Sequence, residues 1–537
     1  MNDLVNHRIR RSWTAEGPGA ASLPDRAVRW LGQRIGPVGA DRGRSSDSAR
    51  SVGGSALPES ARADLAALLG TDNVLLDPDE RLGRASGLSY LDLLRARAGD
   101  EAVPVPDAVL LPADPEQVQS VLDVCLRHDV GVVPFGGGTS VVGGVAAVRG
   151  DKAAVVALDL VRLDELVSVD PVSRIAVLQA GVRGPEAERL LAAHGFTLGH
   201  VPQSFERATI GGFAATRSAG QASSGYGRFE EMVAGVRLAT PKGEWRLGVA
   251  PASAAGPDLR QLAVGSEGAL GVITEVALRV RPLPEQRYYE GWVVDGWAAG
   301  AAAVRKLAQE HALADVTRLS DVDETTVSFA LNAGWQTTAL RAYLAARGIR
   351  NPCLLIVGWE GEVARRRGRT RAMLRRAGAR RIGTTLGDSW RRGRFSGPRQ
   401  RDALMELGVC VETLETAAYW SNLAELHEAV RTALVASLGR AIVMCHVSHA
   451  YETGASLYFT VLASRDGTDP IGQWQRAKAA ASEAITGLGT ISHHHAVGVD
   501  HAPYLSAEIG RIGVDVLRAA KTAVDPTGIL NPGKLLA

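Results

Sequence analysis

Residues 134–145 read PFGGGTSVVGGV, and this stretch decides the fold. One apolar run ends at Val133, just before it, and a second covers residues 153–160. Three consecutive glycines leave the backbone free of side chains and able to adopt positive φ, and Thr139 and Ser140 add hydroxyl donors. Successive bare amides of this kind form a nest that fits a pyrophosphate. A glycine-rich hairpin without a ligand is the alternative interpretation.

The loop differs from the two commonest nucleotide-binding motifs. It is not followed by the Gly-Lys-Ser/Thr of a P-loop, and it is not a GxGxxG turn. Two more segments rich in glycine and hydroxyl groups follow before residue 280, namely ATIGGFAATRSAG at 208–220 and GSEGALGVIT at 265–274. Three such segments are better explained by one large phosphate-bearing cofactor than by three separate turns.

The composition is that of an ordinary globular protein. The chain has 537 residues, of which 46% are hydrophobic and 22% charged, with a net charge of +2. This length predicts two or more domains, and the charge balance does not require a nucleic-acid partner. The four cysteines form no CxxC pair, which indicates reduced thiols. We expect a cytoplasmic protein, because we find no secretory signal, no peroxisomal address and no run of about 20 apolar residues.

The organisation changes along the chain. Residues 1–100 are expected to be helical and linker-like, and partly disordered at 41–60, where Gly, Ser and Arg accumulate. Residues 101–285 alternate short strands with helices, an α+β pattern, and Asp114 suits the N-cap of a helix that follows it. Residues 286–500 hold strand-like apolar runs between helices, as expected of a substrate-binding cap domain.

Two histidine clusters carry the candidate chemistry. The segment CHVSH at 445–449 precedes a strand that contains Tyr458, and His493, His494 and His495 stand in a row. Histidine transfers protons near neutral pH, and tyrosine can do so when its pKa is lowered. A zinc or iron site is the second interpretation, and a histidine-rich turn without a function is the third.

Arginines supply candidate anion sites. Arg401 opens a helical segment and Arg318 follows a strand-like run, and a guanidinium fork suits a phosphate or a carboxylate. Each could instead form a surface ion pair. Nine arginines fall within residues 365–381, where a solvated helix is favoured over an anionic-lipid surface.

The glycine-rich segments, together with VAGVRLATPKG at 233–243, resemble the FAD-binding PCMH-type domain of the vanillyl-alcohol-oxidase superfamily. The segment DPTGILNPGKLL resembles the C-terminal return to that domain in the same superfamily, which we expect of residues 501–537. The resemblance implies a two-subdomain FAD-binding domain and an α/β cap with an antiparallel sheet over the flavin. No His or Cys stands in the glycine loop, so we expect noncovalent FAD.

The resemblance also implies which residues contact the cofactor. The first loop would bind the diphosphate, and the other two segments would enclose the adenine-ribose and isoalloxazine groups. The expected residues are Pro134, Phe135, Gly136, Gly137, Gly138, Thr139, Ser140, Gln203, Ser204, Thr209, Gly211, Gly212, Ala215, Thr216, Arg217, Ser218, Gly220, Glu267, Gly268, Gly271, Val272 and Ile273.

The order Arg401, Tyr458 and residues 493–495 is similar to that of the alkylglycerone-phosphate synthase (alkyldihydroxyacetonephosphate synthase) family. In that family the arginine faces the substrate phosphate, and the tyrosine and histidine loop serve acid/base steps. The resemblance thus implies catalytic roles for Tyr458 and the histidine loop. It implies substrate binding by Arg401, with Arg318 in support. Exchange of the acyl group of acyl-dihydroxyacetone phosphate for a long-chain alcohol, an ether-lipid reaction, is then expected. The chain departs from the family at Ala496 and Asp500.

Alternatives to the synthase hypothesis remain open. Relatives that oxidise D-2-hydroxy acids have a metal set of two histidines and a glutamate. When aligned, His446 keeps the first histidine, but Tyr458 and His494 replace the other two ligands, so no metal is expected. An FAD-linked oxidase or dehydrogenase of an alcohol or 2-hydroxy acid is the second hypothesis, and a catalytically silent flavin- or lipid-binding protein is the third. We expect a lipid or alcohol substrate, and leave open a homodimer and peripheral membrane contact.

Overall fold

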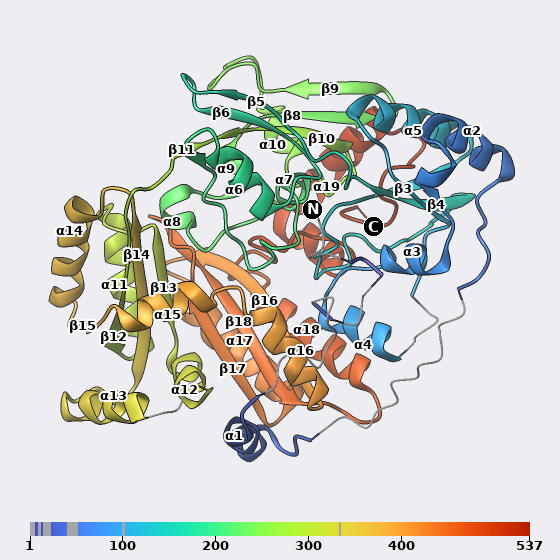
Figure 1. Ribbon diagram of the computed structural model, residues 1–537. Coiled ribbons are helices and arrows are strands. Elements are labelled where there is room, and N and C mark those ends of the chain that lie inside the picture. Colours follow the sequence, from blue (N-terminus) through green and yellow to red (C-terminus); the bar gives the residue numbers. More distant parts are fainter. Residues whose placement is uncertain are drawn as a thin grey trace.

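The computed structural model describes residues 6–8, 12–13, 23–39, 52–98, 103–331 and 335–536, and the statements below concern these residues. The chain forms two bodies, one built mainly from the segments coloured blue and green in Figure 1 and one from those coloured yellow and orange. The linker predicted at 41–60 lies partly outside the described residues, and its described end enters helix α2 (Glu59–Leu69).

A small sheet carries the glycine loop. Its order is β1-β2-β4-β3, and β2, β4 and β3 run parallel. Helix α5 (Pro115–Arg127) packs on it, and the Asp114 side chain accepts a hydrogen bond from the Gln117 N–H (2.7 Å), which confirms the predicted N-cap. Strands β2, β3 and β4 are buried on both faces, as parallel strands usually are. They are β1 (Val74–Leu75), β2 (Ala108–Leu110), β3 (Val130–Phe135) and β4 (Ala154–Asp159).

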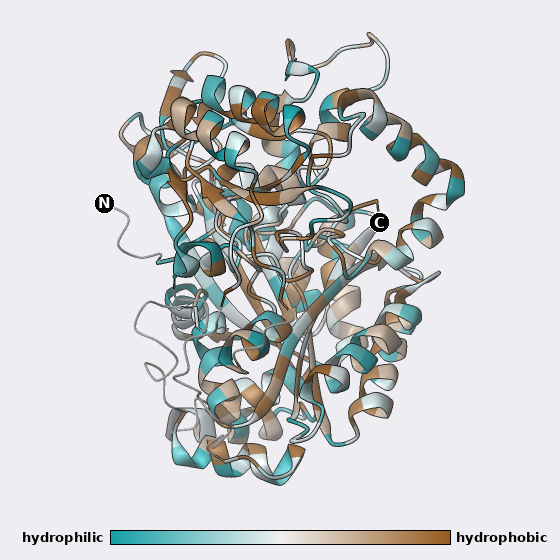
Figure 2. Ribbon diagram, turned by 90° about the vertical axis from the view of Figure 1, so that its right-hand side faces the viewer, coloured by the Kyte–Doolittle hydropathy of each residue, from teal (hydrophilic) through white to brown (hydrophobic). Residues whose placement is uncertain are grey.

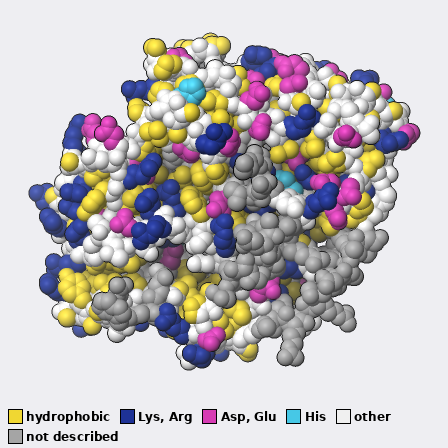
Figure 3. All heavy atoms as spheres, in the orientation of Figure 1, with side chains coloured by type: hydrophobic (Ala, Val, Ile, Leu, Met, Phe, Trp, Pro, Cys, Tyr) yellow, Lys and Arg dark blue, Asp and Glu magenta, His cyan; other side chains and the backbone are white. Residues whose placement is uncertain are grey.

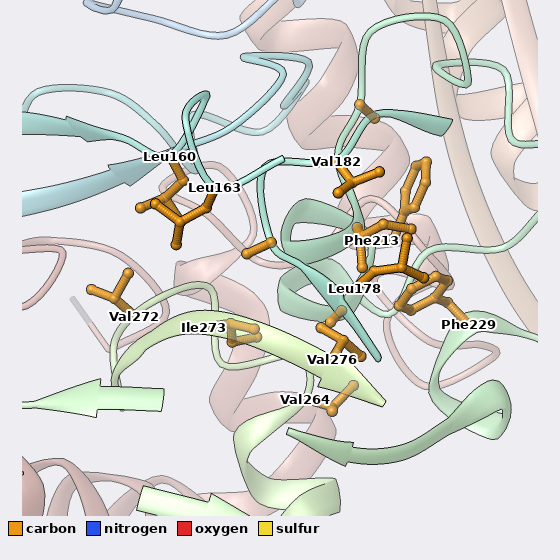
Figure 4. Close-up of a cluster of buried hydrophobic side chains, with 14 of the residues drawn as sticks. Leu160, Leu163, Leu178, Val182, Phe213, Phe229, Val264, Val272, Ile273 and Val276 are labelled. Atoms are coloured by element: carbon orange, nitrogen blue, oxygen red, sulfur yellow. The ribbon is translucent and has the colours of Figure 1, made fainter. Parts of the chain in front are cut away.

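A second, antiparallel sheet completes the first body. Its order is β5-β6-β10-β8-β9, and its core is made by side chains that include Leu178, Val276 and Phe213 (Figure 4). The strands are β5 (Leu166–Asp170), β6 (Ile175–Gln179), β8 (Val233–Thr240), β9 (Gly243–Leu247) and β10 (Val272–Arg279), with the pair β7 (Phe196–Thr197) and β11 (Arg281–Pro282) beside them. The helices are α6 (Gly184–Ala192), α7 (Ile210–Thr216), α8 (Ser223–Tyr226), α9 (Phe229–Met232) and α10 (Leu259–Ala263).

The second body is built on a seven-stranded antiparallel sheet with the order β15-β12-β14-β13-β17-β18-β16. The helices of the molecule carry both hydrophilic and hydrophobic residues, drawn in teal and brown in Figure 2. The strands are β12 (Arg287–Asp295), β13 (Val316–Ser320), β14 (Pro352–Glu360), β15 (Arg380–Gly383), β16 (Val409–Tyr419), β17 (Ala441–Val447) and β18 (Gly454–Ser464). The helices are α11 (Trp297–Gln309), α12 (Val322–Leu331), α13 (Trp335–Ala346), α14 (Val363–Arg376), α15 (Thr385–Gly393), α16 (Gly397–Glu406), α17 (Leu423–Leu438) and α18 (Pro470–Ile485).

The two ends of the chain join the bodies. Helix α2 packs on α5 of the first body, whereas α1 (Asp25–Ile35) and α4 (Tyr90–Ala98) bury Leu31 and Leu93 in the cap core. Short helices α3 (Pro78–Gly83), η2 (Thr71–Asn73) and η3 (Ala502–Tyr504) lie in the connections. After α19 (Leu505–Val524) the chain pairs with β3, because the Val132 N–H donates to the Ile529 carbonyl at 2.7 Å.

The arginine-rich segment forms α14 and part of β15. Lys and Arg side chains gather at the left edge of Figure 3, where Figure 1 places these elements. Arg366 pairs with Asp315 at 2.6 Å, and Arg371 and Arg381 both pair with Glu290, which is buried. Part of this positive charge is therefore neutralised within the fold. None of the helices in the described ranges combines the length and the apolar character that a membrane-spanning segment requires.

Candidate active site

The three glycine-rich segments meet in the first body. A Cβ atom on Gly136 would overlap the Thr209 hydroxyl, and one on Gly137 would lie 2.7 Å from the Ala208 Cα. A Cβ on Gly268 would lie 2.8 Å from the Pro134 ring. Such approaches require residues without a side chain. The first loop is thus enclosed by the other two segments.

The first loop presents backbone donors. Within the described part of the chain, the N–H groups of Gly137, Thr139 and Ser140 donate to no protein acceptor. The Ser140 hydroxyl instead accepts a hydrogen bond from the Gly144 N–H at 2.9 Å and so shapes the end of the loop. Ser266, on the third segment, is buried, and its hydroxyl has no hydrogen-bond partner among the described residues. These groups suit a phosphate-bearing ligand.

Several residues expected to contact the cofactor hold the fold together. The Thr209 hydroxyl caps α7 by accepting from the Gly212 N–H (3.2 Å), and the Arg217 guanidinium donates to the Val264 carbonyl (3.0 Å). Val272 and Ile273 bury their side chains in the core (Figure 4), which leaves only their backbone for a cofactor. Other side-chain contacts are those of Gln203 with Gln221, Thr216 with the Gly212 carbonyl and Ser218 with His200.

The histidine loop is organised by one buried carboxylate, Glu415 of β16. It accepts hydrogen bonds from the N–H groups of His493, His494 and His495 at 2.7, 3.0 and 2.8 Å. It also accepts from the Ser492 hydroxyl at 3.0 Å. Burial raises the pKa of Glu415, but the neighbouring imidazoles and N–H donors outweigh burial and hold that pKa well below its usual range. Glu415 is therefore ionised at neutral pH.

Tyr458 of β18 lies among the predicted histidines. Its ring stacks on His446 at 4.9 Å between centroids, and it lies 6.0 Å from the ring of His494 and 5.8 Å from that of His495. Burial raises the pKa of Tyr458 to about 12. The hydroxyl therefore carries its proton at neutral pH, which makes it a proton donor. A lowered tyrosine pKa, the condition under which a tyrosine acts as a base, is not what the structure shows.

Burial shifts the pKa of the imidazoles in the opposite direction from that of Tyr458. Burial lowers the pKa of His493, His494 and His495, the last to about 3, because a charged ring is poorly solvated there. His493 Nδ1 lies 2.9 Å from His494 Nδ1, and His493 Nε2 lies 2.6 Å from the Tyr451 hydroxyl. At neutral pH the rings are uncharged and can accept protons.

The two predicted substrate arginines lie in different surroundings. Arg401 of α16 donates to the Leu88 carbonyl at 2.8 Å, and its buried Nε has no partner among the described residues. Its charge also acts on Tyr458. Arg318 of β13 donates to Glu324 and to His446 Nδ1, the latter at 3.0 Å. Arg401 lies 4.0 Å from the Glu412 carboxylate but retains a donor for a ligand, whereas Arg318 forms a closer ion pair with Glu324.

A group of histidines has spacing that could hold a metal ion. One nitrogen from each of His449, His493 and His494 falls within 4.8 Å of the others. In the structure these rings are engaged by protein groups, since His449 Nδ1 contacts the Ser223 hydroxyl and His493 contacts Tyr451. His446 lies outside the group and contacts Glu324 at 3.1 Å.

Comparison with known proteins places this geometry in a family. Residues 106–247 match an FAD binding domain, and residues 283–535 match the C-terminal domain of FAD linked oxidases. The alkyldihydroxyacetonephosphate synthase of Trypanosoma brucei brucei is 32% identical over 88% of this chain and 80% of its own length. The Dictyostelium discoideum synthase is 31% identical over 89% and 81%. The chain belongs to the alkyldihydroxyacetonephosphate synthase family.

Solved structures agree with the family assignment. A crystal structure of an alkyldihydroxyacetonephosphate synthase superposes with a TM-score of 0.82 at 28% identity, over 97% of this chain and 94% of that one. A D-lactate dehydrogenase (cytochrome) of Arabidopsis thaliana is a more distant relative, 27% identical over 87% of this chain and 78% of its own. The predicted α+β fold class and the predicted FAD cofactor are confirmed, and the protein is an FAD-dependent enzyme.

The residues present fit FAD. The bare amides of Gly137, Thr139 and Ser140 suit its diphosphate, and the unpartnered Ser266 hydroxyl supplies one further polar contact. The close approaches at Gly136, Gly137 and Gly268 bring the second and third segments against the same loop. Sequence reasoning missed Ser266 and gave Glu415 no role. No local pattern marks Glu415, because its partners lie about eighty residues further along the chain.

Proposed function

We propose that this enzyme exchanges the acyl group of an acyl-dihydroxyacetone phosphate for a long-chain alcohol. The bond between the glycerone carbon and the ester oxygen breaks, and a bond from that carbon to the alcohol oxygen forms. The departing acyl group takes one proton from the protein and leaves as the fatty acid, the alcohol gives one proton to the protein, and there is no net oxidation. The similarity of the chain to synthases of this name supports the proposal.

One observation carries the proposal. A protonated phenol, Tyr458, lies beside uncharged imidazoles, His494 and His495, at ring distances of 6.0 and 5.8 Å. A donor and acceptors with separated pKa values are what an exchange with two proton transfers needs. His494 Nδ1 is engaged by His493, so Nε2 is the atom left to take the alcohol proton. Tyr458 would donate to the departing carboxylate.

The remaining side chains orient the substrate and the bases. Arg401, with its buried free Nε, would bind the substrate phosphate. Arg318 would act indirectly, because it holds His446, on which Tyr458 stacks. Glu415 fixes the peptide groups of the histidine loop, which limits their movement before the reaction. FAD supplies the electron-accepting ring when it is bound, and we propose that it is held noncovalently.

An anaerobic assay tests this function. The purified yellow protein is precipitated with acid, and release of the flavin establishes noncovalent binding. Intact protein then receives palmitoyl-dihydroxyacetone phosphate followed by hexadecanol. We expect release of palmitate, formation of the alkyl product and no lasting bleaching of the flavin absorbance. Arg401→Lys serves as the matched variant, which keeps a charge but removes the fork, and we expect a raised KM for the phosphate substrate.

Oxidation of an alcohol or 2-hydroxy acid is the alternative. The similarity to a D-lactate dehydrogenase supports it. The same assay separates the two, because stable bleaching by D-lactate or by hexadecanol alone, without acyl exchange, would assign the protein to the oxidases. A flavin-loaded protein that neither bleaches nor exchanges acyl groups would support a binding role.

A further inference from the structure

The histidine loop has a second anchor, on the opposite body from Glu415. Glu267 lies within the third glycine-rich segment and is buried. Its two carboxylate oxygens accept hydrogen bonds from the N–H groups of Val497 and Gly498 at 2.9 and 2.8 Å. The loop is therefore held at one end by the cap sheet and at the other by the FAD-binding domain.

The backbone of Glu267 joins the cofactor segments to one another. Its N–H donates to the carbonyl of Ala215, on the second segment, at 3.1 Å. Its carbonyl accepts from the Asn531 side chain at 2.5 Å, and the same amide group donates to the carbonyl of Gly144, on the first segment, at 3.2 Å. Glu267 has φ of +53°, a left-handed conformation that costs free energy in residues other than glycine. The surrounding contacts must hold it there.

We propose that Glu267 is a positioning residue that couples the FAD site to the histidine loop. Its backbone is fixed by the three segments that would surround FAD, and its carboxylate fixes the loop that carries His494. A shift of the cofactor segments would therefore move the proton-transfer histidines. The consequence for catalysis rests on the proposed function, whereas the coupling itself rests only on the contacts. The resemblance implies a cofactor contact for Glu267, and in the structure its carboxylate accepts hydrogen bonds from the Val497 and Gly498 N–H groups.

Burial and hydrogen bonding act on Glu267 in opposite directions, and the two N–H donors favour the ionised carboxylate. Burial raises the pKa of Glu267 to about 7, against the effect of the two N–H donors and of Lys534. Lys534 is buried as well, and its ammonium donates to the Pro532 carbonyl at 3.0 Å. The nearby cation favours the carboxylate. Replacing the carboxylate by an amide would leave one acceptor and turn an NH₂ group toward an N–H donor.

Hydrogen–deuterium exchange on the FAD-loaded protein tests the coupling. In Glu267→Gln we expect the amides of residues 492–499 to exchange at least about tenfold faster than in the unaltered protein. Glu188→Gln is the matched control, because Glu188 also accepts a backbone N–H, from Gly199 at 2.8 Å, but does not contact the histidine loop. We expect no change in the loop of that variant. Equal loop exchange in Glu267→Gln and Glu188→Gln would overturn the proposal.

Turnover and cofactor removal give independent readouts. We expect kcat of Glu267→Gln to fall by roughly 100-fold with KM changed little, and Glu267→Asp to recover part of it. If Glu267→Gln does not fold, removal of FAD from the unaltered protein should also accelerate exchange of residues 492–499, and an unchanged rate would overturn the coupling. Exchange does not depend on which reaction is catalysed. Failure of the synthase assay would therefore leave this result intact.

Discussion

At the scale of single residues, burial moves the pKa of the Tyr458 hydroxyl and the pKa of the His495 imidazole in opposite directions. It raises the pKa of the Tyr458 hydroxyl to about 12 and lowers that of the His495 imidazole to about 3, because the charged form is disfavoured in each case. The two groups lie within 5.8 Å between ring centroids. At neutral pH the candidate site thus holds a protonated phenol and an uncharged imidazole, the forms that the proposed proton transfers require.

Tyr458→Phe tests the donor. The ring and its stacking on His446 are retained, and only the hydroxyl is lost. We expect kcat for acyl exchange to fall by about 100-fold or more, with the flavin content unchanged. Tyr343→Phe is the control, since that tyrosine is 41% exposed. Equal kcat values for the two variants would show that Tyr458 transfers no proton.

At the scale of elements, two loops without regular structure are ordered in different ways. Buried hydrogen-bond acceptors order the histidine loop, and glycines that allow close backbone packing order the first glycine loop. Glu415 of β16 accepts three consecutive backbone N–H groups of the histidine loop. The first glycine loop is instead shaped by contact, because Gly137 lies against the backbone of Ala208. Hydrogen bonds to a buried carboxylate therefore fix the histidine loop, and close backbone packing fixes the first glycine loop.

Glu415→Gln should destabilise the protein. The amide loses an acceptor and leaves buried N–H groups unpaired, which costs about 1–3 kcal/mol for each group. Urea unfolding followed by circular dichroism measures the change. Glu425→Gln, on the exposed side of α17, is the control and should lie within about 0.5 kcal/mol of the unaltered protein. A similar small change for Glu415→Gln would contradict the anchoring role.

Gly137→Ala should reduce FAD binding. The added methyl group would lie 2.7 Å from the Ala208 Cα, so the loop must move away from the second segment. We expect purified protein with less flavin per chain, measured by absorbance after denaturation. Gly368→Ala is the matched control, because nothing lies within 4 Å of that position in α14. Replacing a helical glycine there should stabilise the protein by about 1 kcal/mol, with full flavin content.

At the scale of the whole molecule, acid stability is set by where histidines are buried. Burial lowers the pKa of seven of the described histidines, namely His200, His446, His449, His493, His494, His495 and His501. The histidines of the unfolded chain bind protons near pH 6.5, whereas the buried histidines of the folded chain bind them only at lower pH. The contribution of these histidines to the free energy of unfolding is therefore present above pH 6.5 and is lost as the pH falls below it.

Melting temperatures across pH 8 to 4 check this dependence. Each histidine that stays neutral in the folded protein lowers the free energy of unfolding by up to about 1.4 kcal/mol for each pH unit below 6.5. We therefore expect a steep fall in Tm that begins near pH 6.5. Glu267 works in the other direction, because its raised pKa makes the folded state take up a proton first. His495→Gln should flatten the fall. A Tm that stays constant to pH 5 would contradict the burial of neutral imidazoles.

The sequence alone determined the family, the α+β class and the FAD cofactor, because glycine spacing and hydroxyl placement are local patterns that a cofactor's phosphates impose. The domain limits, the individual contacts to FAD, its noncovalent attachment and the cytoplasmic location stay predictions. Only the tertiary structure decided the protonation states of Tyr458 and the histidines and the anchoring of the histidine loop. Burial of Tyr458 depends on strands β16, β17 and β18 together. Glu415 and Glu267 meet their partners across about eighty and two hundred and thirty residues, a separation at which no local pattern connects a carboxylate to the amides that it accepts.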